Sequence, residues 1–239
     1  MLHYLLYQVL FRQYGTTSES YFYKGLNVFQ YVTFRTAWAT ITALLLSLFL
    51  GKWLIRKLDD LKVGQEIREE LSVEHQEKKG TPTMGGVLII GSVVISTILW
   101  SRLDNTFIWI ALVATALFAS IGFADDYIKI VKKRSLGLTG TQKIVGQLLT
   151  AAGVWATLYF YTDYAWNISI PFIKATAETE GISYVGPIVY LFFICFILLG
   201  SSNAVNLTDG LDGLATSVTF IAMSALTALT YVASDRRWA

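Results

Sequence analysis

Two short polar segments of this chain lie directly beside long apolar runs. Asp125-Asp126 follows one run, and residues 203–212, with two asparagines and two aspartates, separate two others. Carboxylate and amide groups next to membrane hydrocarbon are costly, so a sequence that carries them there usually uses them for function. The two segments together predict a polar reaction centre at one face of a membrane.

The acidic pair indicates different roles for its two members. If the segment is helical, adjacent side chains point about 100° apart, so Asp125 and Asp126 would not hold one ion side by side. The structural alternative is a pair of solvated acids at a helix end, paired with Lys129 at helical spacing. Both interpretations stay open at this point.

The second polar segment repeats a spacing of three residues. Asn203 and Asn206 are three apart, as are Asp209 and Asp212, so a helical turn would place each pair on one face. Amides donate and accept hydrogen bonds, and the glycines beside them leave room for a ligand. The structural alternative is a helix cap or turn. Four such residues between two apolar runs favour the functional interpretation.

Lysines accompany these acids. Lys78 precedes a segment rich in Thr and Gly, and Lys129, Lys133 and Lys143 follow the acidic pair. Mg²⁺ takes one or two carboxylates and completes its shell with water and phosphate oxygens, while lysines neutralise further phosphate charge. The pattern therefore predicts phosphoryl transfer with a lipid phosphate as one reactant. Anchoring of helix ends at the cytoplasmic face explains the lysines alone equally well.

The composition indicates an integral membrane protein. Hydrophobic residues make up 54% of the 239 residues and charged residues only 15%, against about 25% in soluble domains. Six apolar runs approach the roughly 20 residues that a membrane-spanning helix needs. They are residues 34–50, 84–100, 107–123, 144–161, 185–200 and 214–232. We expect an all-α, polytopic helical membrane protein in which residues 1–239 form a single integral membrane domain.

Composition and motif placement also exclude or disfavour several functions. The net charge of +2 is too small to imply a nucleic-acid partner. The single Cys195 and the distant His3 and His75 provide neither a disulfide framework nor a His/Cys zinc site. A transporter would place acids near the middle of the membrane and interrupt its spans with Pro or Gly. Here the acids follow apolar runs, which disfavours a transporter.

The distribution of Lys and Arg predicts the orientation of the chain. Twelve of its 19 basic residues lie in the connections after the first and third apolar runs, and connections rich in Lys and Arg face the cytoplasm. Both acidic segments fall on this side, although neither was used to assign the spans. We therefore expect a cytoplasmic site.

Four segments resemble the phospho-N-acetylmuramoyl-pentapeptide transferase family (MraY), which belongs to the polyprenyl-phosphate N-acetylhexosamine-1-phosphate transferases. They are residues 26–35, the Gly-Thr-Pro-Thr-Met-Gly-Gly sequence at 80–86, residues 122–127 and residues 203–215. The resemblance covers essentially the whole chain in order. It implies a multi-pass protein of the bacterial inner (plasma) membrane that acts in peptidoglycan and cell-wall synthesis, and thereby in cell shape and division.

The resemblance also implies a reaction. Members of the family transfer phospho-MurNAc-pentapeptide from UDP-MurNAc-pentapeptide to undecaprenyl phosphate, giving lipid I and UMP, with Mg²⁺ as cofactor. Direct transfer and transfer through an aspartyl phosphate both stay open. A sister enzyme that moves N-acetylglucosamine-1-phosphate is the alternative, and the Pro-Thr-Met-Gly-Gly sequence favours the muramoyl donor. Membrane lipids are expected partners, and a homodimer is a candidate assembly.

The family's functional residues carry over onto matching positions of this sequence. Asp125 becomes the catalytic candidate that deprotonates or positions the lipid phosphate. Asp126 becomes the second catalytic candidate, at the metal and the diphosphate, and Asp126 and Asp209 become the metal-ligand candidates. The substrate-binding candidates are Lys78, Thr83, Lys129, Lys133, Lys143, Asn203, Asn206, Asp209 and Asp212.

One departure from the family concerns length. The family has about ten spans, and this chain carries about six. The family's main metal-binding aspartate and its histidine-rich loop would lie beyond residue 239. The chain therefore resembles an N-terminal fragment, incomplete at its C-terminus, and we expect the 239-residue chain alone to be inactive.

Overall fold

The computed structural model describes residues 1–15, 21–60, 84–132, 136–164, 166–169, 182–184, 186–209 and 213–234. Contacts divide the chain into two compact units. The first comprises Met1–Thr150 with Phe160–Thr162, and the second comprises Ala151–Tyr159 with Asp163–Ala239. The acidic pair belongs to the first unit, whereas Asn203, Asn206 and Asp209 belong to the second.

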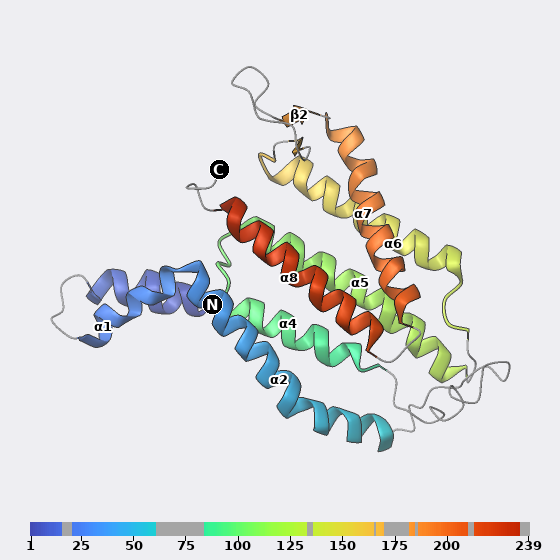
Figure 1. Cartoon of the computed structure of the whole chain (residues 1–239), viewed down its shortest axis with the longest axis horizontal. Helices are drawn as coiled ribbons and strands as arrows, with labels where there is room; N and C mark the ends of the chain where they lie inside the picture. The colour runs from blue at the N-terminus through green and yellow to red at the C-terminus, as the bar shows by residue number, and fades with distance from the viewer. Residues whose placement is uncertain are drawn as a thin grey trace. The chain divides into compact units, whose positions relative to one another are not determined.

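Long apolar helices make up most of the described chain (Figure 1). Five of them are long and apolar enough to cross a membrane, with at most 22% of each apolar window buried inside the protein. Apolar surface exposed to this extent is typical of a protein surrounded by lipid. The predicted all-α, polytopic membrane class is therefore confirmed. The five helices are α2 (Val32–Asp60), α5 (Thr106–Val131), α6 (Gly140–Tyr161), α7 (Gly186–Thr208) and α8 (Leu214–Ser234).

The remaining predicted span forms a shorter helix. α4 (Gly86–Trp100) is apolar but has 15 residues, a length of about 22 Å at 1.5 Å per residue, against a hydrocarbon core of about 30 Å. It ends where Ser101 adopts an extended backbone. The described residues thus contain five candidate spans and one shorter apolar helix, where the sequence predicted about six spans.

Three short helical segments precede α2 in the first unit. They are the π-helical η1 (His3–Gly15), α1 (Tyr21–Gly25) and the 3₁₀-helical η2 (Leu26–Gln30). The Tyr7 hydroxyl donates to Gln30 Oε1 at 3.1 Å and joins η1 to η2. The mostly apolar residues 5–11 lie within η1.

Small polar side chains line the contact between α2 and α4, which lie side by side in the first unit (Figure 1). Ser92 and Ser96 of α4 are only 3% and 2% exposed. The Ser96 hydroxyl donates to the carbonyl of Ala39, and the Ser47 hydroxyl donates to Ser92 Oγ at 3.3 Å. Small residues let two membrane helices approach closely, and hydroxyl hydrogen bonds then join them.

We expect Ser92→Leu to destabilise the α2–α4 pair by about 1–3 kcal/mol, because a larger side chain in a closely packed contact forces the helices apart. Val93→Leu is the matched control, because the adjacent Val93 is 44% exposed. Thermal denaturation of both variants in detergent measures the effect. Equal melting temperatures for the two variants would contradict the close α2–α4 contact.

α7 extends further into polar sequence than the apolar run predicted. The run ends at Gly200, but the helix continues to Thr208, so Asn203 and Asn206 lie in its last turns and not in a loop. Asn203 Nδ2 donates to the Leu199 carbonyl at 2.8 Å. Side chains that bond to the carbonyls of their own helix satisfy their polar groups there, so a polar segment can remain helical.

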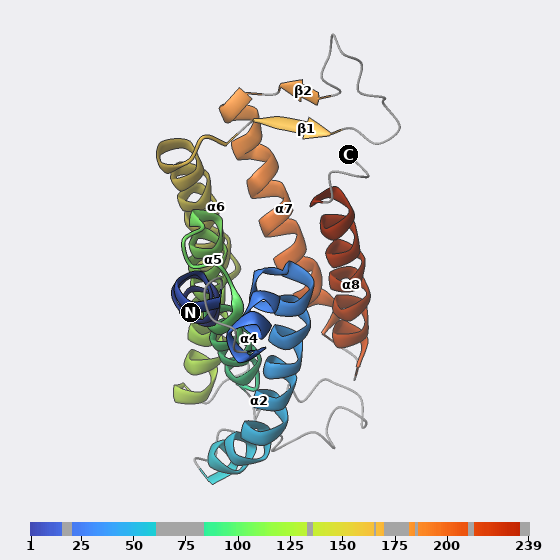
Figure 2. The same ribbon diagram turned by 90° about the vertical axis from the view of Figure 1, so that its left-hand side faces the viewer.

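The second unit contains a two-stranded antiparallel sheet (Figure 2). β1 (Asn167–Ser169) pairs with β2 (Ile182–Tyr184), and Ile168 lies opposite Ser183. The two strands lie in the connection between α6 and α7.

Hydrogen bonds and aromatic rings connect the C-terminal half of α6 to the start of α7 within the second unit. Trp155 Nε1 donates to the carbonyl of Pro187 at 2.7 Å, and the hydroxyls of Tyr164 and Tyr190 share a hydrogen bond. The Trp155 ring also stacks on Tyr159. These contacts hold the C-terminal half of α6 against the start of α7.

Candidate functional site

The acidic pair lies inside α5 and not at its end. The apolar run stops at Phe123, but the helix continues to Val131, which corrects the predicted placement at a helix end. The Asp125 side chain is 10% exposed, while that of Asp126 is 33% exposed. Two adjacent positions on the helix thus give one nearly buried and one accessible carboxylate, as their expected angular separation requires.

Lys129 pairs with both acids. Its Nζ lies 2.7 Å from Asp125 Oδ2 and 3.1 Å from Asp126 Oδ1, at the i+4 and i+3 positions of the helix. The ion pair that the sequence offered as a structural alternative is therefore present. Asp125 also has other partners, which come from the start of the next helix.

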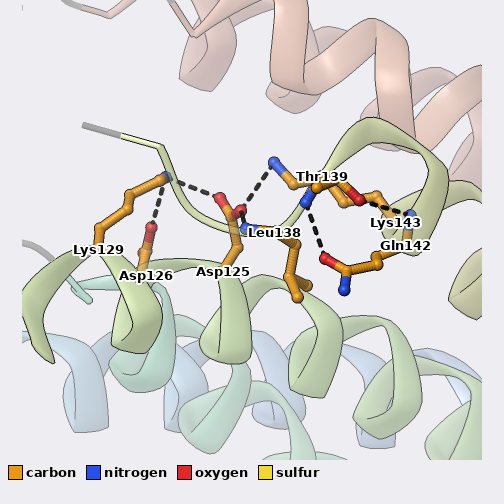
Figure 3. A network of polar contacts seen from close by, with 7 residues as sticks. All are labelled: Asp125, Asp126, Lys129, Leu138, Thr139, Gln142 and Lys143. Carbon is orange, nitrogen blue, oxygen red and sulfur yellow. Dashed lines mark hydrogen bonds and ion pairs between the residues drawn. The ribbon is translucent and has the colours of Figure 1, made fainter. Parts of the chain in front are cut away.

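The segment that enters α6 provides those partners (Figure 3). Asp125 Oδ1 accepts a hydrogen bond from the Leu138 backbone N–H at 2.8 Å and lies 3.0 Å from Lys143 Nζ. A capping box begins the helix: the Gln142 N–H donates to Thr139 Oγ1, and the Thr139 N–H donates to Gln142 Oε1. Such reciprocal capping satisfies two backbone N–H groups at the start of the helix and ties Thr139 to its first turn.

Charges are balanced in this cluster, which comprises Asp125, Asp126, Lys129 and Lys143. Two carboxylates face two ammonium groups, so the four side chains carry no net charge when all are ionised. Both oxygens of Asp125 already accept from donors, whereas the Asp126 carboxylate is more accessible. A phosphate or diphosphate group placed here would bring negative charge that a divalent cation could offset.

The second polar segment is described in its own unit. Asn203 is half-buried in α7, Asn206 is exposed on the same helix, and Asp209 is exposed in the turn that follows. The helix gives Asn203 and Asn206 the predicted spacing of about one turn. Asp209 and Asp212 cannot be compared in this way, because Asp212 lies outside the described residues.

Several site candidates fall outside the part of the chain that the structure describes. The structure brings together four of the candidates, Asp125, Asp126, Lys129 and Lys143. Within the described ranges, no group of three or more His, Cys, Asp or Glu side chains could hold a metal ion. The candidates outside those ranges, which stay predictions, are Lys78, Thr83, Lys133 and Asp212.

The sequence interpretation missed two members of the site, Gly137 and Leu138. Leu138 contributes through its backbone N–H, and Gly137 contributes by having no side chain next to Asp125. Neither role follows from hydropathy or charge. The Thr139-x-x-Gln142 pattern was a usable signal, since a Thr followed three residues later by Gln marks the start of a helix.

Comparison with known proteins agrees with this arrangement. The model of glycosyl transferase family 4 matches residues 108–239, more than half of the chain, and signature 1 of phospho-N-acetylmuramoyl-pentapeptide-transferase matches residues 78–90. The family match includes the whole cluster around Asp125 and the polar end of α7. The signature match includes the candidates Lys78 and Thr83.

Curated relatives that match this chain carry the name phospho-N-acetylmuramoyl-pentapeptide-transferase. The Koribacter versatilis protein is 43% identical over 100% of this chain and 64% of its own length. The Syntrophus aciditrophicus protein is 44% identical over 88% of this chain and 54% of its own length. The Desulfatibacillum aliphaticivorans protein is 47% identical over 87% of this chain and 56% of its own length.

The chain thus spans a little over half of the length of the curated relatives that it matches. The match to the family model begins at residue 108, near the start of α5, and ends at residue 239. It includes both polar segments. The membrane helices and the acidic cluster both lie largely within the part of the chain that matches the family model. The chain belongs to glycosyl transferase family 4 and is a multi-pass membrane protein.

Proposed function

We propose that this chain forms part of an enzyme that transfers phospho-MurNAc-pentapeptide from UDP-MurNAc-pentapeptide to undecaprenyl phosphate. The observation that carries the proposal is Asp125, held between Lys129 and Lys143 beside the accessible Asp126 in a membrane-spanning helix. Carboxylates and ammonium groups in this arrangement suit phosphoryl transfer, in which positioning and electrostatic stabilisation dominate. The names of the relatives and the signature at residues 78–90 support the muramoyl donor.

In the proposed reaction, an oxygen of the lipid phosphate attacks the phosphorus that is bonded to the sugar. A phosphorus–oxygen bond forms to the lipid phosphate, the bond to the uridine phosphate breaks, and UMP leaves. Lys129 and Lys143 would bind phosphate oxygens on either side of Asp125. Because both Asp125 oxygens already accept hydrogen bonds, its geometry favours positioning of the lipid phosphate and of these ammonium groups.

Mg²⁺ is the proposed cofactor, and the donor set of the cluster is compatible with it. Mg²⁺ prefers carboxylate oxygens and commonly uses only one or two of them, with water and phosphate oxygens completing its shell. Asp126 offers a partly exposed carboxylate with these properties, and Asp209 is the second proposed ligand. When bound, the ion would neutralise charge on the diphosphate. The residues of the chain would orient the phosphates around it.

The proposed location is the inner membrane of a bacterium, with the site at the cytoplasmic face. The predicted orientation supports this placement, because the connections richest in Lys and Arg follow α2 and α5. Consecutive spans alternate in direction, so the six apolar runs predicted from the sequence put both polar segments after runs that end on the same side.

Release of UMP tests the proposal. The protein made from the complete coding sequence, termed the complete gene product, is assayed in detergent with undecaprenyl phosphate and Mg²⁺. UDP-MurNAc-pentapeptide and UDP-N-acetylglucosamine are compared as donors, and the 239-residue chain is assayed in parallel. We expect release with the muramoyl donor. Release with only the N-acetylglucosamine donor would assign the chain to the sister enzyme, and no release with either donor would contradict a transferase.

We also expect no UMP release from the 239-residue chain by itself, because the curated relatives are longer. Sustained release from this chain at a rate comparable to that of a relative would overturn that expectation. Removal of Mg²⁺ with a chelator, followed by its return, tests the cofactor in the same assay.

A further inference from the structure

The Asp125 carboxylate is held by donors of two kinds. Lys129 and Lys143 reach it through long side chains that are 37% and 28% exposed. The third donor is the backbone N–H of Leu138, which lies 13 positions along the chain and contacts Oδ1 at 2.8 Å. Lysine side chains carry a flexible point charge, so either ammonium group can move toward a phosphate. A backbone N–H in an ordered segment cannot move in this way.

Gly137 makes the close approach of this segment possible. A Cβ atom at position 137 would lie 2.6 Å from the backbone oxygen of Asp125 and 2.7 Å from its Cγ, and closer still to Oδ1. Distances this short are sterically forbidden, so any side chain at this position would displace either the carboxylate or the segment. Gly137 does not have a positive φ, since the described glycines that do are Gly186 and Gly213. The obstacle to a larger residue is therefore Asp125 itself.

The Gly137–Leu138 segment is fixed at its other end by the start of α6. The capping box between Thr139 and Gln142 places the segment against the first turn, and the Lys143 N–H continues the helix by donating to the Thr139 carbonyl at 3.1 Å. Figure 3 shows Asp125 facing this segment from α5. One short stretch therefore supplies both the amide that fixes Oδ1 and the helix that carries Lys143.

We propose that the backbone of Gly137 and Leu138 is a positioning element for Asp125. It holds the carboxylate in one orientation while Lys129 and Lys143 are free to exchange this carboxylate for phosphate oxygens. The expected effect on turnover rests on the proposed function. The positioning of the Asp125 carboxylate rests only on its contacts with Gly137 and Leu138. Fixed donors of this kind keep a reacting group aligned without reorganisation.

Gly137→Ala tests the positioning element, with Gly140→Ala as its matched control. Gly140 lies three positions further along, and a Cβ there would meet no atom within 4 Å. In the complete gene product we expect Gly137→Ala to lower kcat for UMP release about 100-fold, the scale of a 1 Å misplacement, with the KM for the nucleotide donor nearly unchanged. Gly140→Ala should behave as wild type. Wild-type kcat in a folded Gly137→Ala protein would overturn the proposal.

A second measurement works without turnover and separates this proposal from the proposed function. The 239-residue chain in detergent is treated with a carbodiimide and an amine, and modification of Asp125 is quantified by mass spectrometry. We expect modification to rise severalfold in Gly137→Ala and to stay at the wild-type level in Gly140→Ala. Unchanged modification of Asp125 in Gly137→Ala would overturn the positioning role even if the enzyme assay failed for every variant.

Coupling to Asp125 distinguishes positioning from a general effect on folding. If Gly137 acts through Asp125, then adding Gly137→Ala to an Asp125→Asn protein should lower the residual rate by less than twofold, because the effects of groups that act as a unit do not add. A full additional 100-fold loss in the double variant would assign Gly137 a structural role and overturn the proposal.

Discussion

Asp125→Asn in the complete gene product is expected to lower the rate of UMP release by about 100-fold or more, the scale expected when a group that positions the reacting phosphate is lost. The amide has no charge to hold Lys129 and Lys143, and its single oxygen replaces only one of the two carboxylate oxygens that accept from Lys129, Lys143 and the Leu138 N–H. Steady-state release of UMP with the muramoyl donor measures the effect. Gel filtration and thermal denaturation of the variant check that it remains folded.

Asp104→Asn is the matched control for this substitution. Asp104 lies between α4 and α5 and pairs with Arg102 at 2.7 Å, but both side chains are about half exposed. The hydrogen bond from Arg102 lowers the pKa of Asp104, so the control also removes one carboxylate charge at neutral pH. Exposed ion pairs contribute little to stability. Wild-type turnover in a folded Asp125→Asn protein would remove Asp125 from the mechanism.

The sequence was sufficient to predict the class of fold and the approximate position of each span. A run of apolar residues indicates a segment that contacts hydrocarbon, and such a segment must be helical to satisfy its backbone hydrogen bonds. Each of the six predicted runs therefore corresponds to an apolar helix. Helix ends were less predictable. α5 and α7 continue past Phe123 and Gly200, because backbone hydrogen bonding does not stop where the side chains become polar.

The acidic cluster was only partly predictable. The pairing of Asp125 and Asp126 with Lys129 follows from helical spacing alone, and the structure confirms it. The contact between Asp125 and Lys143 depends on how the chain returns from α5 to α6, which no local pattern determines. The Leu138 N–H was hidden for a further reason: every residue except proline carries such a donor, so its use leaves no mark on the sequence.

These differences affect how the lysines are interpreted. From the sequence, Lys129, Lys133 and Lys143 were equivalent members of a basic cluster that could serve only to anchor helices at the cytoplasmic face. The structure separates Lys129 and Lys143 from that general role, because both contact Asp125. Lys133 lies outside the described residues and keeps both interpretations.

Lys143→Gln is expected to lower kcat/KM for UMP release by about tenfold to a hundredfold. A hydrogen bond to a charged group contributes about 1.5–3 kcal/mol, and 1.36 kcal/mol corresponds to a tenfold change in rate. Asp125 would keep its contacts with Lys129 and Leu138, so the protein should remain folded. The loss should appear mainly in the KM for undecaprenyl phosphate if Lys143 binds that phosphate directly. Initial rates at several concentrations of the lipid separate the two parameters.

Lys132→Gln completes this test because it removes the same charge from the same side of the membrane. Lys132 follows the last residue of α5 and is exposed. If the lysines served only to anchor helix ends, the two substitutions would weaken the protein equally, since the positive-inside effect depends on the number of charges and not on their contacts. A selective loss in Lys143→Gln therefore supports a phosphate site built around Asp125. Equal rates for the two variants would show that Lys143 only anchors the helix end. Lys129 would then be the one lysine among the described residues that remains in the proposed site.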